Sequence, residues 1–334
     1  MVKQVGLLLP LLLLSCGAAK PASGPASAAP TPTPAPSANA PTSVVPTTTL
    51  SATATVAAQP PPTFRDCGEL GCKTFASAED AFDFVLAETP RVLAVGEAHA
   101  QSDGPKAASS TRRFMDGLLS HLAPRASDLL IELWLANGSC GKVEQKVQKQ
   151  QGAVTAPQAT TNQGDFVELG HRAKALGIMP HALVPSCEQY QKIAGAGAAD
   201  IEDMLGMIKS VTEHDIEQLL TQRAPDRLLV AYGGAMHNDL VPRPGREDFS
   251  FGPALALATG GHYVELDLVI PEQIKDSEAW RGLPWYPHYS REKAGPGAYL
   301  YSWAPHAYAL LFPKSDPAPT KGPGSEARDK PAAK

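Results

Sequence analysis

Three short apolar runs of this chain each end on an ionisable or metal-binding side chain. Residues 91–95 are followed by Gly-Glu-Ala-His, residues 227–232 by Gly-Gly-Ala-Met-His, and residues 129–131 by a glutamate. Short apolar runs of this kind are typical of buried strands in a parallel sheet. The carboxyl ends of parallel strands meet at one edge, where ligands bind. We therefore expect four side chains to lie together: Glu97, His99, Glu132 and His237.

The rest of the central segment alternates between strand and helix patterns. Strands are expected at 91–95, 128–133, 177–184, 227–232 and 262–269. Helices are expected from Ser77 onwards, near 110–122, over most of 142–174 with an interruption at 153–163, and over 201–220. A last apolar run at 308–312 fits an edge strand. Alternation of this kind predicts an α/β fold with a mostly parallel central sheet flanked by helices.

The first residues predict export from the cytoplasm. A basic start is followed by an apolar segment at 5–14 that is too short to span a membrane. Leu13-Leu14-Ser15-Cys16 resembles the lipobox of bacterial lipoproteins, which implies cleavage before Cys16 and its acylation. An ordinary signal peptide is the alternative. We expect a cell-envelope lipoprotein held to the lipid bilayer through Cys16. Gly17 replaces the aspartate typical of inner-membrane retention, which favours the outer membrane.

Composition divides the 334 residues into four parts. Residues 1–15 form the signal peptide, and residues 16–62, rich in Ala, Pro, Ser and Thr, are expected to be a disordered tether. Residues 63–313 are long enough for one domain with a substantial core. Residues 314–334 are a second segment expected to be disordered.

The cysteine count agrees with an exported protein. Of five cysteines, four remain beside Cys16, and an even number in an oxidising compartment predicts two disulfides. Three pairings are open, and we favour Cys67–Cys72 with Cys140–Cys187. A four-cysteine metal site is the alternative, but the close Cys-x-x-Cys pairs typical of such sites are missing.

Several function classes are disfavoured. The formal net charge is -5, and the sequence has no concentrated basic stripe, so we expect no nucleic-acid partner. The sequence also has no Gly-x-Ser-x-Gly elbow, no phosphate-binding glycine loop and no His-Glu-x-x-His motif. Serine hydrolases, nucleotide enzymes and metalloproteases of the His-Glu-x-x-His type are therefore not expected.

The chemistry of the four candidate residues has two interpretations. Glu97 and His99 are two positions apart in a turn, where they suit a general base with its orienting partner or two ligands of one divalent ion. A surface turn in which Glu97 caps the next helix is the alternative. Glu132 ends an apolar strand, where a carboxylate without a partner is costly, so a cation or metal is expected beside it.

The motifs resemble those of the ChaN, erythromycin-esterase and Tiki/TraB superfamily. The resemblance covers about residues 91–272 and places Glu97, His99, Glu132 and His237 at the shared positions. It implies an α/β fold with paired glutamates and histidines at one sheet edge, and activities that range from haem binding to ester or peptide hydrolysis. The residues after His99 lack the further histidine often found in ChaN-like sequences.

Two hypotheses for the function follow. In the first, Glu97 or Glu132 activates water while His99 and His237 bind a divalent metal, and the protein hydrolyses an ester or peptide bond in a small-molecule or peptide ligand. In the second, the protein is a non-catalytic haem-binding or iron-uptake lipoprotein, or a degenerate binding module. Tyr232 is a further candidate haem ligand. The aromatic group around Trp285 is interpreted either as a lid or as packing.

Overall fold

The computed structural model describes residues 62–136, 138–195, 201–292 and 294–315. The signal peptide predicted at 1–15 and the lipidated cysteine Cys16 lie outside the described residues. So do the predicted tether up to residue 61 and the predicted tail from residue 316. Within the described ranges, no helix combines the length and the apolar composition that crossing a membrane requires.

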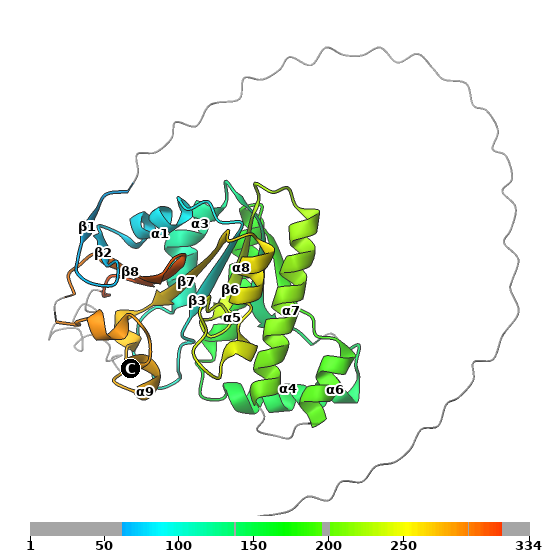
Figure 1. Cartoon of the computed structure of the whole chain (residues 1–334). Helices are drawn as coiled ribbons and strands as arrows, with labels where there is room; N and C mark the ends of the chain where they lie inside the picture. Colours follow the sequence, from blue (N-terminus) through cyan, green and yellow to red (C-terminus); the bar gives the residue numbers. More distant parts are fainter. Residues whose placement is uncertain (1–61, 137, 196–200, 293, 316–334) are drawn as a thin grey trace, which may run out of the picture. The chain divides into compact units, whose positions relative to one another are not determined.

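Nine strands of the described residues form one mixed sheet in the order β1-β2-β8-β9-β7-β3-β6-β4-β5 (Figure 1). The strands from β9 to β5 run parallel, and β1, β2 and β8 extend the sheet with antiparallel pairs. The α/β fold with a mostly parallel sheet is therefore confirmed. Their bounds are β1 Phe64–Asp66, β2 Lys73–Phe75, β3 Val92–Glu97, β4 Ala126–Trp134, β5 Met179–Leu183, β6 Leu228–Gly234, β7 Tyr263–Val269, β8 Ala298–Ala304 and β9 Ala307–Leu311.

Helices connect most of these strands. Ser77 caps α1 as expected, because its hydroxyl accepts the N–H of Asp80 at 3.0 Å. The expected helix near 110–122 is continuous but contains a π-helical turn, η1. The helical bounds are α1 Ala78–Leu86, α2 Ser110–Arg113, η1 Phe114–Leu118, α3 Leu119–Leu122, α4 Lys142–Thr155, α5 Thr161–Ala175, α6 Cys187–Gly195, α7 Ile201–Gln222, α8 Gly252–Ala258 and α9 Glu278–Arg281, with short 3₁₀ turns η2 Glu247–Phe249, η3 Pro271–Gln273 and η4 Tyr286–His288.

The sheet is covered on both faces. Side chains of a strand alternate between the two faces, so Leu93 packs with the core that includes Phe82 of α1 and Phe114 of η1. Its neighbour Ala94 faces the other way, into a core formed with α7 and α8. Burial on both faces explains why the central strands are continuous apolar runs.

One expectation at the end of the domain needs correction, and one open alternative is decided there. The run at 308–312 was expected at a sheet edge, but β9 lies between β7 and β8, and all five of its residues are buried. The reason is that β9 pairs with β7 on one side and on the other with β8, a strand that the sequence pattern did not predict. The aromatic group around Trp285 is packing rather than a lid, because Trp285 is only 1% exposed and stacks on Tyr301 of β8.

The two disulfides have the pairing favoured from the sequence. Cys67 is bonded to Cys72 within a short loop, and Cys140 is bonded to Cys187 across 47 positions. The second bond joins the segment just before α4 to the first residue of α6, and these two helices pack on each other. It therefore fixes one wall of the cleft described below.

Candidate functional site

The register of the parallel strands places the candidate residues at the same level of the sheet. Glu97, the last residue of β3, is paired with Gly234, the last residue of β6. On the other side of β6, Ile131 of β4 is paired with Tyr232, so Glu132 comes level with the glycine pair. The structure thus brings the ends of β3, β6 and β4 together, as the strand-end motifs predict.

Glu97 is buried and both of its oxygens are occupied. Its Oε1 accepts a hydrogen bond from Nδ1 of His99 at 3.1 Å. Its Oε2 accepts one from the Thr111 hydroxyl at 2.7 Å and one from the Tyr232 phenol at 2.8 Å. Because Glu97 is buried and bonded to three side chains, it orients His99 rather than contacting a ligand.

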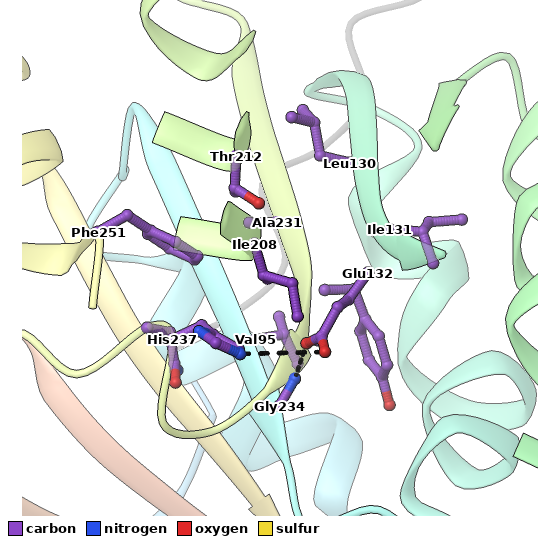
Figure 2. Close-up of a pocket in the computed structure, with 13 residues that line it drawn as sticks. Val95, Leu130, Ile131, Glu132, Ile208, Thr212, Ala231, Gly234, His237 and Phe251 are labelled. Carbon is purple, nitrogen blue, oxygen red and sulfur yellow. Dashed lines mark hydrogen bonds and ion pairs between the residues drawn. The ribbon is translucent and has the colours of Figure 1, made fainter. Parts of the chain in front are cut away.

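Glu132 reaches over β6 because both residues beneath it are glycines. A Cβ on Gly233 would lie 2.5 Å from Glu132 Oε2 and 2.8 Å from its Cβ, which no side chain tolerates. The Gly234 N–H donates to Oε2 at 2.6 Å. This bond leaves Oε1 facing His237 (Figure 2). The same oxygen lies 3.8 Å from Nε2 of His99.

His237 lies at the end of a tight turn that begins at Gly234. Its own N–H donates to the Gly234 carbonyl at 2.9 Å. Its Nδ1 is 2.8 Å from the carbonyl oxygen of Phe249, and since a carbonyl only accepts, Nδ1 carries the proton. The other nitrogen, Nε2, is therefore the one that points toward Glu132 (Figure 2).

One oxygen of Glu132 lies near two imidazole nitrogens. His99 Nε2 is 3.8 Å and His237 Nε2 is 4.0 Å from Glu132 Oε1. A Cβ added to Gly234 would lie within 4 Å of all three side chains, so the absence of a side chain there leaves the space between them open. Each imidazole has its Nδ1 fixed by an acceptor and turns its Nε2 toward Glu132, and without an ion the raised pKa of His99 keeps a proton on that nitrogen. Histidines oriented through Nδ1 are of the donor type that divalent metal ions take, but the three side chains do not all lie within 4.8 Å of one another, so an ion bound there would draw them together.

The charges of the site also favour a cation. Burial alone would lower the pKa of His99, but hydrogen bonds and attraction from Glu132 and Glu97 outweigh it and raise the pKa to about 10. Burial would likewise raise the pKa of Glu132, but the two histidines and the Gly234 N–H lower it to about 2. The ionised carboxylate of Glu132 thus lies beside the protonated imidazole of His99.

Two clefts reach the site, and His99 lines both of them. One, of about 760 Å³, is lined by His99, Glu132 and residues at the end of β4, along α4 and at the start of α5. The other, of about 400 Å³, lies between the loop after β3 and Trp280 of α9. Glu97 and His237 are each only 4% exposed, whereas the side chains of His99 and Glu132 are 21% and 16% exposed. Ligands therefore meet His99 and Glu132 first.

Tyr232, the further candidate haem ligand, does not line either of these two clefts. Tyr232 is buried and its hydroxyl is bonded to Glu97, so it does not face a cleft as a haem ligand would. Thr111 was not singled out from the sequence, because a threonine at the start of a helix carries no distinctive signal. The carbonyl of Phe249, which orients His237, also has no sequence signature.

No protein-family model and no curated protein matches this chain. Solved structures with a similar fold include the type III effector HopBA1, with 9% identity, a TM-score of 0.37, and coverage of 78% of this chain and 100% of the effector. An erythromycin esterase mutant, EreC, in its open conformation has 10% identity, a TM-score of 0.40 and coverage of 69% and 92%. ChaN of Campylobacter jejuni, whose structure shows cofacial haem binding, has 11% identity, a TM-score of 0.31 and coverage of 69% and 91%.

With identities of 9–11% and TM-scores of 0.31–0.40, these structures assign no function to this chain, and the function of the site is inferred from its own side chains.

Proposed function

We propose that this protein is a metal-dependent hydrolase that cleaves an ester or peptide bond at the Glu/His site. The observation that carries the proposal is that two imidazole Nε2 atoms, each with its Nδ1 held by an acceptor, lie about 4 Å from one oxygen of Glu132. His99 and His237 would hold the ion. A divalent ion bound there would polarise the scissile carbonyl and acidify a bound water.

The two glutamates have different tasks in this proposal. Glu132 is the general base, because its Oε1 carries no hydrogen bond from a backbone donor, it is ionised, and it is partly open to the cleft. Glu97 is a positioning residue, because Thr111, Tyr232 and His99 occupy its two oxygens. The proton that Glu132 accepts from water passes to the leaving group within the same cleft.

The cleft supports a polar ligand of moderate size. Its wall along α4 carries Gln148, Gln151 and Thr155, and the opposite side carries Gln163 and Phe166. Amide and hydroxyl groups of this kind donate hydrogen bonds to ester and peptide carbonyls, and their oxygens accept hydrogen bonds from peptide N–H groups. A small-molecule or peptide ligand fits this lining.

The experiment combines metal analysis with turnover. The purified full chain is analysed for bound metal and tested on panels of esters and peptides. His99→Ala and His237→Ala should each weaken metal binding by roughly 10- to 100-fold. Glu132→Gln should keep its ion and lose roughly 100-fold or more in turnover. His214→Ala, on the exposed side of α7, is the matched control and should change neither. A parent protein that binds no divalent ion, with unchanged turnover in both histidine variants, contradicts the proposal.

Haem binding is the second candidate function. The cleft of about 760 Å³ presents the imidazole edge of His99 together with Trp134 and Phe166, which suits a large planar ligand. Titration with haem would then give a Soret band that is weakened or shifted in His99→Ala. In this case the panels show no turnover.

We also propose that the site is carried by an envelope lipoprotein anchored through Cys16. The two disulfides support an oxidising compartment. Cys16→Ser should release the protein from membranes without changing the melting temperature of the domain. If the variant stays with the membrane fraction after a salt wash, the anchor is not at Cys16.

A further inference from the structure

A second cluster of ionisable groups lies beside the Glu/His site and takes no part in it. Asp239 lies in the loop after β6, and Glu265 and Asp267 lie two positions apart on β7. One oxygen from each of the three carboxylates lies within 4.8 Å of the other two. Glu265 is 1% and Asp267 is 6% exposed, so the cluster is inside the protein.

Two buried oxygens at this cluster have no hydrogen-bond partner. Glu265 uses Oε2 to accept the Leu240 N–H, while its Oε1 has none. Asn238 is 2% exposed and donates through Nδ2 to Asp267 and to the Ala94 carbonyl, while its Oδ1 has no partner. The carbonyl of Ala94 fixes this amide orientation, because it requires a donor. Buried oxygens without partners are costly and point to a missing ligand.

The backbone of β3 leaves space for these oxygens. A Cβ on Gly96 would lie 2.5 Å from Asp267 Oδ1 and 2.6 Å from Asn238 Oδ1. Glycine at this position therefore allows both oxygens to lie close together against the strand. The register agrees, because Gly96 is paired directly with Asp267.

The cationic groups that act on the cluster do not balance it. Arg243 attracts Asp239 and Asp267, and Arg246 attracts Asp239. Burial and repulsion from Asp239 raise the pKa of Asp267 to about 8, and burial and Asp267 raise that of Glu265. A cation among the three carboxylates would favour their ionised forms.

We propose that Asp239, Glu265 and Asp267, with the side-chain oxygen of Asn238, bind a hard divalent cation such as Ca²⁺ or Mg²⁺. The donor set consists of oxygens alone, which these ions prefer, whereas the histidines of the Glu/His site suit softer transition metals. The argument for this ion does not require the proposed hydrolase activity.

The proposed ion would have a positioning effect on the first site. Asn238 and Asp239 follow His237 directly, and Tyr263 and Ser250 already hold their carbonyl groups. An ion bound by both side chains adds a further restraint on the turn that carries His237. The two sites would then be linked through three consecutive residues.

The test uses the full chain after treatment with a chelator. Ca²⁺ and Mg²⁺ are added separately, and binding stoichiometry and melting temperature are measured. We expect one ion to bind and to raise the melting temperature by roughly 5 °C at saturating concentration. The double variant Glu265→Gln/Asp267→Asn should lose this shift. The double variant His99→Ala/His237→Ala should retain it, because its acidic cluster is intact.

A third variant guards against misfolding. Asp239→Asn changes the least buried carboxylate of the cluster and should weaken binding roughly tenfold or more without preventing folding. The proposal is overturned if neither ion binds the parent protein. It is also overturned if the shift persists in the acidic variants and disappears in the histidine variant, since the ion then occupies the Glu/His site.

Discussion

The phenol of Tyr232 on β6 donates a hydrogen bond of 2.8 Å to the carboxylate of Glu97 on β3. Both side chains are buried, so this bond lies inside the protein rather than at its surface. Burial, followed by the charge of Glu97, raises the pKa of this phenol well above its ordinary value, so it remains a donor at physiological pH. Thr111 donates to the same oxygen. The orientation of His99 therefore depends on residues that never contact a ligand.

Replacing Tyr232 with phenylalanine tests this dependence. The buried oxygen of Glu97 would keep only Thr111 as a donor, and losing a hydrogen bond to a charged group should cost about 1–3 kcal/mol of unfolding free energy. The measurement is urea unfolding of the parent and the variant. Tyr190→Phe is the control, since Tyr190 is equally buried but bonds to Trp134. We expect only Tyr232→Phe to weaken metal binding.

The ion pair between Asp128 and Arg223 predicts a pH-dependent stability. Burial would raise the pKa of Asp128, but hydrogen bonds from Arg223 at 2.7 and 2.8 Å, and from His181 at 2.8 Å, hold that pKa well below its usual range. A carboxyl with a lowered native pKa contributes stability that is present above its unfolded pKa and is lost as pH falls toward the native value.

Asp128→Asn should accordingly lower the unfolding free energy by about 1–3 kcal/mol at pH 7. The difference from the parent should shrink steadily as the pH falls below about 4. Denaturant unfolding between pH 2 and pH 7 measures it. Asp66→Asn, in an exposed pair, should follow the parent curve throughout. A difference for Asp128→Asn that does not change with pH would contradict the assignment.

The two disulfides should contribute unequally to stability. In the chain-entropy model the long loop closed by Cys140–Cys187 is worth about 4 kcal/mol and the short loop closed by Cys67–Cys72 about 2 kcal/mol. Cys140→Ser/Cys187→Ser should therefore melt at a lower temperature than Cys67→Ser/Cys72→Ser. Thiol labelling of the denatured, unreduced parent should find almost no free thiol on these four cysteines. Equal melting temperatures would mean that loop length does not determine the effect.

The sequence predicted the central strands because burial on both faces leaves a continuous apolar run. It did not predict β1 and β2, since Phe-Arg-Asp and Lys-Thr-Phe are too short and polar to differ from loops. They become strands by pairing with each other and with β8. The interior position of β9 likewise depends on β8 and not on its own residues.

The convergence of the candidate residues was predictable because strand ends of a parallel sheet meet. The hydrogen bonds that orient them were not, since Thr111 and Tyr232 lie 14 and 135 positions from Glu97. The acidic cluster was also missed. Glu265 and Asp267 occupy the polar positions of an alternating strand, which normally face water, but the loop with Asp239 and Leu240 covers them.

The glycine pair before His237 gives the sharpest test of the shared site. A Cβ on Gly234 would lie 3.3 Å from His99 Nε2 and 3.4 Å from Glu132 Oε2, in the space between the proposed ligands. Gly234 has an ordinary negative φ, so alanine is compatible with the backbone. Gly234→Ala should fold and weaken metal binding roughly tenfold or more, as loss of a ligand's supporting contacts does.

Two further glycine-to-alanine variants are compared with Gly234→Ala. Gly233→Ala should be more damaging, because the added carbon would lie 2.5 Å from Glu132 Oε2 and displace that side chain. Gly206→Ala, inside α7 with open space around it, should raise the unfolding free energy by about 0.5–1 kcal/mol and leave metal binding unchanged. Calorimetric titration with a divalent ion and thermal melting distinguish the three. If Gly234→Ala binds the ion as tightly as Gly206→Ala, then His99 and His237 do not share one ion beside Gly234.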